Sequence, residues 1–226
     1  MSETTWNTDR LVGFDTETTG IDTAHDRIVS AAIVDGADTA NWLIDPGVEI
    51  PPAASRVHGI TTERARAEGA APAEALAEIA QALGKAAAEG VPVVVYRAGF
   101  DLTLLSHELD RHDLPQVPWA ELRVVDPFVL DKKCDKYRKG KRTLSVVCEH
   151  YGVSLTDAHS AAADARAAVD LARAIGERHG QVRTMSAAEL HNAQIGWHAD
   201  DAAGLQEFFR RKGRDEVVDG RWPLQR

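Results

Sequence analysis

Residues 14–20, which read Phe-Asp-Thr-Glu-Thr-Thr-Gly, constrain this chain more than any other segment. They follow the apolar residue Leu11, which predicts that Asp15 and Glu17 lie late on a first β-strand over about residues 10–16. Because residues two apart on a strand point to the same face, both carboxylates project to one side. Adjacent carboxylates repel each other, and a hard divalent cation such as Mg²⁺ relieves that repulsion. The segment therefore indicates either a metal site or a polar edge strand with two solvated acids.

The composition of the chain excludes several classes of protein. With 226 residues, 44% hydrophobic and 27% charged, the chain is expected to form one soluble domain with a helical extension. No apolar run approaches the roughly 20 residues that span a membrane, and the N-terminus lacks the features of a signal peptide, so we expect a cytoplasmic protein without a membrane partner. The net charge of −9 argues against non-specific coating of nucleic acid. It remains compatible with an enzyme that holds a few nucleotides through metal ions.

One segment departs from the acidic average. Residues 132–142 contain seven basic residues and a single acid, Asp135. Taken alone, such a run is a solvated loop. Beside a site that handles phosphates, it would steer a nucleic-acid strand.

The pattern of apolar residues and breakers predicts an α/β fold. Strands are expected over 10–16, 27–34 and 39–44, with a turn at 35–38, so the chain opens with a three-strand meander. A loop marked by Pro46, Pro51 and Pro52 follows, and Thr61 then caps a short helix. A β-branched run over 91–96 predicts a strand buried on both faces, and a further strand lies near 123–125. Helices are expected over 72–89, 100–109, 144–151, 160–177 and 186–211, the last as one or two helices. The result is a mixed sheet with helices on its faces.

Two further acidic positions occur downstream. Asp101 follows the buried strand where a helix begins, and ligands of open α/β sheets bind at such strand ends. Asp164 lies in the helix over 160–177, and His159 precedes that helix. Each residue alone has a plainer interpretation, since Asp101 would complement a helix dipole and the other two would be ordinary surface residues.

Taken together, these residues resemble the DnaQ-like (DEDDh) 3′–5′ exonucleases of the ribonuclease H-like superfamily. The resemblance runs from about residue 11 to 175, and the chain is similar to the exonuclease domain of the epsilon subunit of DNA polymerase III. Its main motifs are 14–20, 98–101 and 159–165, with subsidiary similarity over 50–61 and 144–152. Arg97 departs from the family, which usually has Asn at this position, and Ala53 stands where some relatives have an acid.

The resemblance implies a mixed five-stranded sheet flanked by helices. It implies an exonuclease domain over residues 8–180, followed by a helical C-terminal extension over 181–226 that packs on this domain. Apolar residues of the extension are expected to make that contact, namely Trp197, Leu205, Phe208 and Phe209.

The resemblance also implies a two-metal phosphodiesterase that uses Mg²⁺ or Mn²⁺. Four carboxylates would hold the two ions, and these are Asp15, Glu17, Asp101 and Asp164. His159 would be the general base. The terminal nucleotide would contact Thr18, Thr19, Gly20, His58 and Phe100.

The expected substrate is DNA, which the protein would bind as a single strand or at its 3′ terminus. A DNA polymerase is a candidate partner. Two alternatives stay open. An exoribonuclease or oligoribonuclease would share the fold and the metals and differ in contacts to the 2′-hydroxyl. A catalytically silent module would keep the fold and bind a polymerase, with Arg97 in place of a metal. The oligomeric state does not follow from the sequence.

Overall fold

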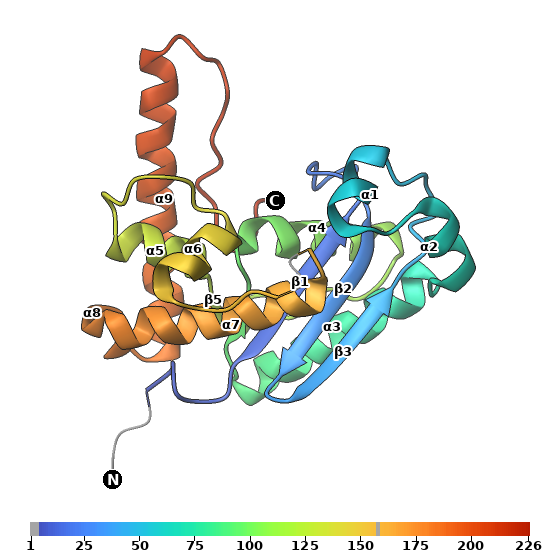
Figure 1. The fold of residues 1–226 in the computed structure, drawn as a ribbon, viewed down its shortest axis with the longest axis horizontal. Coiled ribbons are helices and arrows are strands. Elements are labelled where there is room, and N and C mark those ends of the chain that lie inside the picture. The colour runs from blue at the N-terminus through green and yellow to red at the C-terminus, as the bar shows by residue number, and fades with distance from the viewer. Residues whose placement is uncertain (1–4, 157–158) are drawn as a thin grey trace.

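A five-stranded mixed sheet forms the centre of the computed structural model, which describes residues 5–156 and 159–226 (Figure 1). Its strands are β1 (Val12–Thr18), β2 (Ile28–Asp35), β3 (Asp38–Leu43), β4 (Val93–Val94) and β5 (Val124–Val125). They are arranged in the order β3-β2-β1-β4-β5. The first three are antiparallel neighbours, whereas β4 pairs with β1 and β5 in parallel. The predicted meander and mixed sheet are therefore confirmed.

Strand β4 is much shorter than the predicted strand over 91–96. The whole segment is at least partly buried, yet only Val93 and Val94 pair in the sheet. The chain turns away directly afterwards, because Arg97 adopts a left-handed conformation with φ of 62°. The prediction was wrong in length because a continuous apolar run reports burial, whereas pairing also requires neighbouring strands of matching extent.

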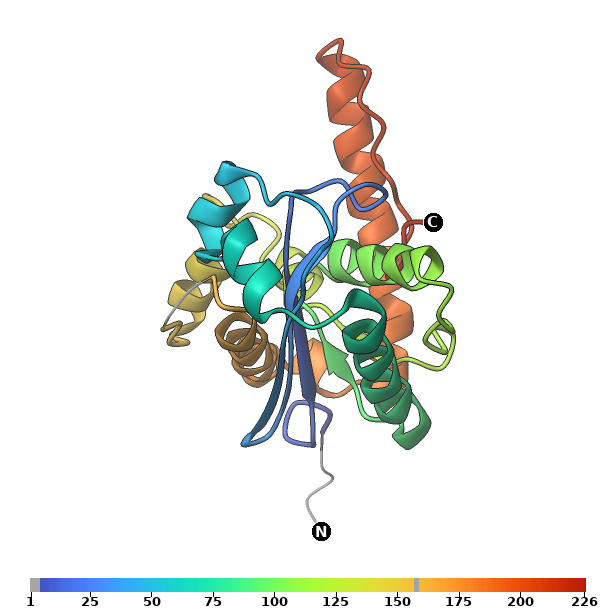
Figure 2. The same ribbon diagram turned by 90° about the vertical axis from the view of Figure 1, so that its right-hand side faces the viewer.

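Helices cover both faces of the sheet, as Figure 2 shows in an edge-on view. One face carries α3 (Pro72–Glu89) and α4 (Ala98–Arg111), and the other carries α6 (Leu144–Tyr151) and α7 (Ala161–Arg178). Each face has its own apolar core. Phe14 and Ile28 belong to the core under α3 and α4, while Val94 and Leu171 belong to the core under α7.

The remaining helices are α1 (Pro52–His58), α2 (Thr62–Glu68), α5 (Pro127–Cys134), α8 (Gly180–Arg183) and α9 (Ala187–Arg211). The sequence analysis did not predict α1, α5 or the short helix α8. Helix α1 lies in the segment that was expected to be a loop, and α5 precedes and overlaps the basic segment. Both begin with proline at the first helical position, where a missing N–H costs nothing. Thr61 caps α2 by accepting the Arg64 amide, as predicted.

Helix α7 lies unusually close to β1. A Cβ atom added at Gly13 would lie 2.6 Å from the carbonyl oxygen of Ala165 and 2.9 Å from Val169. Only glycine therefore permits this approach. The contact fixes the start of α7, which carries Asp164, against the strand that carries Asp15.

The first half of α9 packs at the β5 edge of the sheet, where His191 and Gln194 are buried. Its second half projects away from the domain (Figure 1). Leu205 and Phe208 are 39% and 43% exposed, so the prediction that they pack the helix onto the domain was wrong for both. Trp222 provides an apolar contact instead, because the chain after α9 runs back along the helix and buries this ring against His191.

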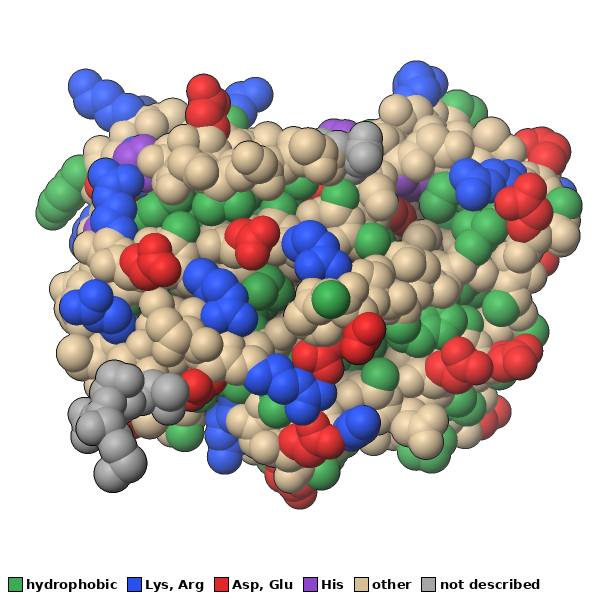
Figure 3. Space-filling model, turned by 60° about the horizontal axis from the view of Figure 1, so that its bottom comes forward, with side chains coloured by type: hydrophobic (Ala, Val, Ile, Leu, Met, Phe, Trp, Pro, Cys, Tyr) green, Lys and Arg blue, Asp and Glu red, His purple; other side chains and the backbone are tan. Residues whose placement is uncertain are grey.

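Acidic and basic side chains share one face of the molecule. On the face drawn in Figure 3, acidic and basic side chains are interspersed rather than gathered by sign. Within the described residues, no helix combines the length and the apolar character needed to cross a bilayer.

Candidate active site

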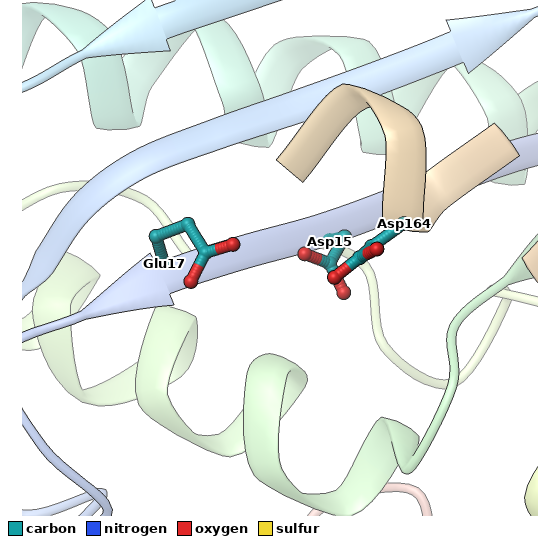
Figure 4. Close-up of side chains that lie close together, drawn as sticks. All are labelled: Asp15, Glu17 and Asp164. Carbon is teal, nitrogen blue, oxygen red and sulfur yellow. The ribbon is translucent and has the colours of Figure 1, made fainter. Parts of the chain in front are cut away.

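Three of the four predicted carboxylates converge at the end of β1. Asp15 and Glu17 project from the same face of this strand, and Asp164 reaches them from the first turn of α7 (Figure 4). Carboxylate oxygens of the three residues all lie within 4.8 Å of one another. The pairing register of β1 with β2 shifts between Glu17 and Thr18, so an irregularity of the kind often found beside active sites follows the two acids.

The surroundings of Asp164 leave one of its oxygens without a partner. The backbone N–H of His159 donates to Asp164 Oδ2 at 3.3 Å. Asp164 Oδ1 is buried and has no hydrogen-bond partner among the described residues. A buried acceptor without a hydrogen-bond partner costs folding free energy, so this oxygen is suited to contact a bound ion or molecule.

Asp101 approaches from the opposite face of β1. It is 4% exposed, and its Oδ1 accepts the Thr16 N–H at 3.1 Å and the Thr16 hydroxyl at 2.6 Å. Thr16 lies between Asp15 and Glu17 on the strand, so its side chain points to the other face. The structure therefore brings three carboxylates together and holds the fourth beside them through Thr16.

Burial raises the pKa of every acid in this group, and repulsion between the acids adds to that rise for Asp15 and Glu17. Burial is the main cause for Asp15, and Asp101, Asp164 and Glu17 raise its pKa further. Burial, followed by repulsion from Asp164 and Asp101, raises the pKa of Glu17 to about 8.

The pKa values of the other two carboxylates, Asp101 and Asp164, are raised as well. Burial raises the pKa of Asp101 to about 7 although the Thr16 hydrogen bonds oppose the change. Burial also raises the pKa of Asp164, opposed by the backbone and the ring of His159.

Among residues 5–156 and 159–226, no lysine or arginine forms an ion pair with these four acids. The partnerless oxygen, the converging carboxylates and the raised pKa values fit a divalent cation, which takes oxygen ligands. The cluster can therefore bind a metal ion, with Asp15, Glu17 and Asp164 as its nearest ligands.

The loop after β1 is held by its own hydrogen bonds. The Thr19 hydroxyl donates to Asp26 at 2.7 Å, and the Thr18 hydroxyl donates to the Gly20 carbonyl at 2.6 Å. A Cβ atom at Gly20 would lie 2.5 Å from the Asp26 carboxylate, so any larger residue here would have to displace that carboxylate, which accepts the Thr19 hydroxyl. The loop thus has a fixed shape directly beside the carboxylates.

The remaining predicted site residues lie on separate elements. His58 ends α1, and burial lowers its pKa while the backbone of Thr18 opposes that change. Phe100 lies in the first turn of α4 and is partly buried against the core. His159 is exposed, with φ of 72°, directly before α7.

Several basic residues of the segment 132–142 form ion pairs within the protein. Arg138 and Arg142 both bind the buried carboxylate of Asp131, and Lys132 pairs with Asp201.

The Arg97 guanidinium lies 4.4 Å from the centroid of the Phe128 ring, a cation–π contact. Arg97 forms no ion pair with the acids among the described residues, so it does not occupy the place of a metal.

Sequence reasoning missed Asp126, which is 1% exposed at the end of β5. Its carboxylate accepts the backbone amides of Arg97 and Ala98, each at 3.0 Å, and that of Phe128 at 2.9 Å. The signal was present, since Asp followed by Pro after a strand is typical of a helix start. Its contact with α4, 28 residues earlier in the chain, has no local signal.

The mixed sheet, with helices on both faces and the acidic cluster at the end of β1, has the ribonuclease H-like fold. The family model described as exonuclease (RNase T) matches residues 12–172, and the chain belongs to this DnaQ-like exonuclease family.

Two curated relatives carry names from DNA polymerase III. A subunit epsilon-like protein of Rhodobacter capsulatus is 40% identical over 113 residues, which are 46% of this chain and 15% of that protein. A PolC-type polymerase of Lacticaseibacillus paracasei is 26% identical over 190 residues, which are 82% of this chain and 12% of that protein. The chain thus spans a small part of the length of either relative.

Solved structures of exonuclease I share the fold. Escherichia coli exonuclease I, bound to a dT13 oligonucleotide, superposes with a TM-score of 0.65 at 21% identity, covering 77% of this chain and 42% of that one. Exonuclease I of Methylocaldum szegediense superposes with a TM-score of 0.62 at 22% identity, covering 88% of this chain and 45% of that one.

Proposed function

We propose that this protein is a metal-dependent 3′–5′ exonuclease that releases nucleoside monophosphates from the 3′ end of DNA. The observation that carries the proposal is the convergence of three carboxylates with raised pKa values and no cationic partner among the described residues. Such an arrangement is unfavourable in the absence of bound cations. It therefore supports a site whose function depends on them.

The residues of the chain have separate roles in this proposal. Asp15, Glu17, Asp164 and Asp101 would hold two Mg²⁺ or Mn²⁺ ions. When bound, these ions supply an activated water and stabilise charge on the leaving 3′-oxygen. His159 would accept the proton from the attacking water, and its exposed position before α7 leaves the ring accessible to substrate.

The substrate would lie against the loop after β1. The rigid backbone around Thr18, Thr19 and Gly20 would contact the terminal nucleotide. His58 and Phe100 would line the pocket for its base. The hydrogen bonds of Thr18 and Thr19 support this role, because a loop of fixed shape positions a nucleotide without paying for its own ordering.

Single-stranded or 3′-terminal DNA is the proposed substrate class. It is supported by the fold shared with exonuclease I, for which a complex with a DNA oligonucleotide is known. The names of the curated relatives support a DNA polymerase as a candidate partner. We further propose that residues 8–180 form the exonuclease unit, that 181–226 form an extension, and that the protein acts in the cytoplasm.

The test is a parallel digestion of 5′-labelled single-stranded DNA, duplex DNA and RNA with Mg²⁺, Mn²⁺ or a chelator. We expect a ladder of products shortened from the 3′ end and no reaction with the chelator. Preference for RNA would favour the exoribonuclease alternative, and metal-independent binding without hydrolysis would favour the silent module.

Asp15→Asn should abolish turnover while the fold persists, because it removes the charge of a proposed metal ligand. Asp170→Asn is the matched control, since Asp170 is an exposed acid on α7 outside the cluster. Turnover like that of the wild type by Asp15→Asn would contradict the metal assignment.

A further inference from the structure

Helix α4 begins without a cap of its own. Its N-cap residue, Arg97, has φ of 62° and ψ of 49° and offers no side-chain acceptor to the first amides. Such amides require an acceptor from elsewhere. Asp126 provides it from the end of β5, because Oδ1 accepts the Arg97 N–H and Oδ2 accepts the Ala98 N–H. One buried carboxylate therefore closes the start of α4 from outside the helix.

Asp101 lies in the first turn of this helix, three residues after Ala98. Two contacts thus determine where its carboxylate sits. Thr16 binds the carboxylate directly from β1, and Asp126 fixes the backbone of the turn that carries it. A change at either contact would move Asp101 relative to Asp15.

The C-terminal extension holds Asp126 in turn. The Gln194 side chain accepts the Asp126 N–H at 2.7 Å and donates to the Val124 carbonyl at 2.9 Å. His191 accepts the Val124 N–H at 3.0 Å, and the indole N–H of Trp222 donates to Asp126 Oδ2 at 3.4 Å. All three residues lie beyond position 172, where the match to the family ends.

The end of the chain also contacts α4 directly (Figure 2). The Gln225 N–H donates to the Thr103 hydroxyl at 2.8 Å, and Arg226 donates to Ser106 Oγ at 2.5 Å. A Cβ atom at Gly99 would lie 3.2 Å from the Gln225 amide nitrogen. The tail therefore packs closely against the turn that precedes and includes Asp101.

We propose that Asp126 is a positioning residue for Asp101, and that the C-terminal extension keeps Asp126 in place. The inference rests on the proposed function, because Asp101 matters only where a metal is bound. A carboxylate suits this position because both of its oxygens accept, whereas an amide would present an NH₂ group to one of the donors. The extension is thereby part of what shapes the active site, although it contributes none of its ligands.

Asp126→Asn tests the inference, with Asp131→Asn as its matched control. Asp131 is also a buried carboxylate, on α5, but its partners are Arg138 and Arg142 rather than α4. Two readouts are independent of turnover: hydrogen exchange at the amides of residues 97–101, and Mn²⁺ binding followed by calorimetry.

We expect Asp126→Asn to speed exchange at these amides at least tenfold and to weaken Mn²⁺ binding by about 10–100-fold, the range for residues that orient metal ligands. Asp131→Asn should lower the melting temperature and leave both readouts unchanged.

Equal loss of Mn²⁺ affinity in the two variants would overturn the inference, since the cause would then be general instability. Unchanged affinity in Asp126→Asn would also overturn it. Should this variant not fold, Trp222→Phe decides, because it keeps an aromatic side chain at this position and removes the indole N–H that donates to Asp126. Unchanged exchange at residues 97–101 in that variant would refute the link. Failure of the proposed function looks different, because wild-type protein would then neither bind Mn²⁺ nor hydrolyse DNA.

Discussion

Replacing Glu17 by Gln should stabilise the protein in the absence of metal. The folded-state pKa of Glu17 is raised from 4.5 to about 8, so this carboxyl binds its proton more tightly when folded than when unfolded. Stability from this group is therefore fully present below about pH 4.5 and is lost as the pH rises through about 8. Gln carries no charge at either pH, so the variant avoids that loss.

The magnitude follows from the size of the shift. At about 1.4 kcal/mol per pKa unit, the ceiling for Glu17 is roughly 5 kcal/mol. The side chain is partly exposed, and solvent screening reduces such a figure to about 1–2 kcal/mol. For a chain of this length the gain corresponds to a rise in melting temperature of about 2–8 °C.

Urea denaturation at pH 5.5 and pH 8, with a chelator present, measures this effect. The variant should exceed the wild type in unfolding free energy at pH 8, and the difference should shrink at pH 5.5. Mn²⁺ added at a hundredfold excess over the wild-type dissociation constant should stabilise the wild type by about 3 kcal/mol. The same concentration should stabilise the variant by less, because the variant has lost one ligand charge.

Glu108→Gln is the control, because Glu108 is a buried carboxylate that pairs with Arg27 and Arg111. That variant should be less stable than the wild type at pH 8. A Glu17→Gln variant that is also destabilised at pH 8 would refute the argument that uncompensated repulsion strains the metal-free site.

Two further predictions concern catalysis and packing. His159→Gln should lower the turnover number by about 10²–10⁴-fold if His159 is the proposed general base, and the melting temperature should not change because the side chain is exposed. Single-turnover kinetics on labelled DNA measure this, and wild-type rates would exclude His159 as the base. Gly13→Ala should cost about 1–3 kcal/mol of unfolding free energy, since the new methyl group would meet the Ala165 carbonyl. Chemical denaturation measures that loss, and an unchanged midpoint would show that α7 can move away from β1.

Local sequence patterns determined much of the fold. Helices α3 and α6 have the predicted bounds, because periodic apolar residues and the glycines at 90 and 152 mark their extents. The meander of β1, β2 and β3 follows from short strands and a tight turn. These features depend on neighbours in the chain, which a sequence displays directly.

The sequence also determined part of the site. The spacing of Asp15 and Glu17 sets both on one face of β1, since alternation is a property of the strand itself. It further predicted that Asp101 lies where a helix begins and that Asp164 lies within a later helix; the structure confirms both placements, and it puts Asp164 in the first turn of α7. The resemblance to a nuclease family rests on these residues, and family membership is confirmed by the match over 12–172.

Only the tertiary structure decided how these pieces meet. It places Asp101 on the Thr16 side of β1, closes α4 with Asp126, shortens β4 to two residues and leaves Leu205 exposed. Each outcome depends on contacts between segments far apart in the chain, such as the approach of α7 that Gly13 permits. Residue spacing fixes the direction of a side chain along its own element, whereas packing of the whole chain fixes what that side chain encounters.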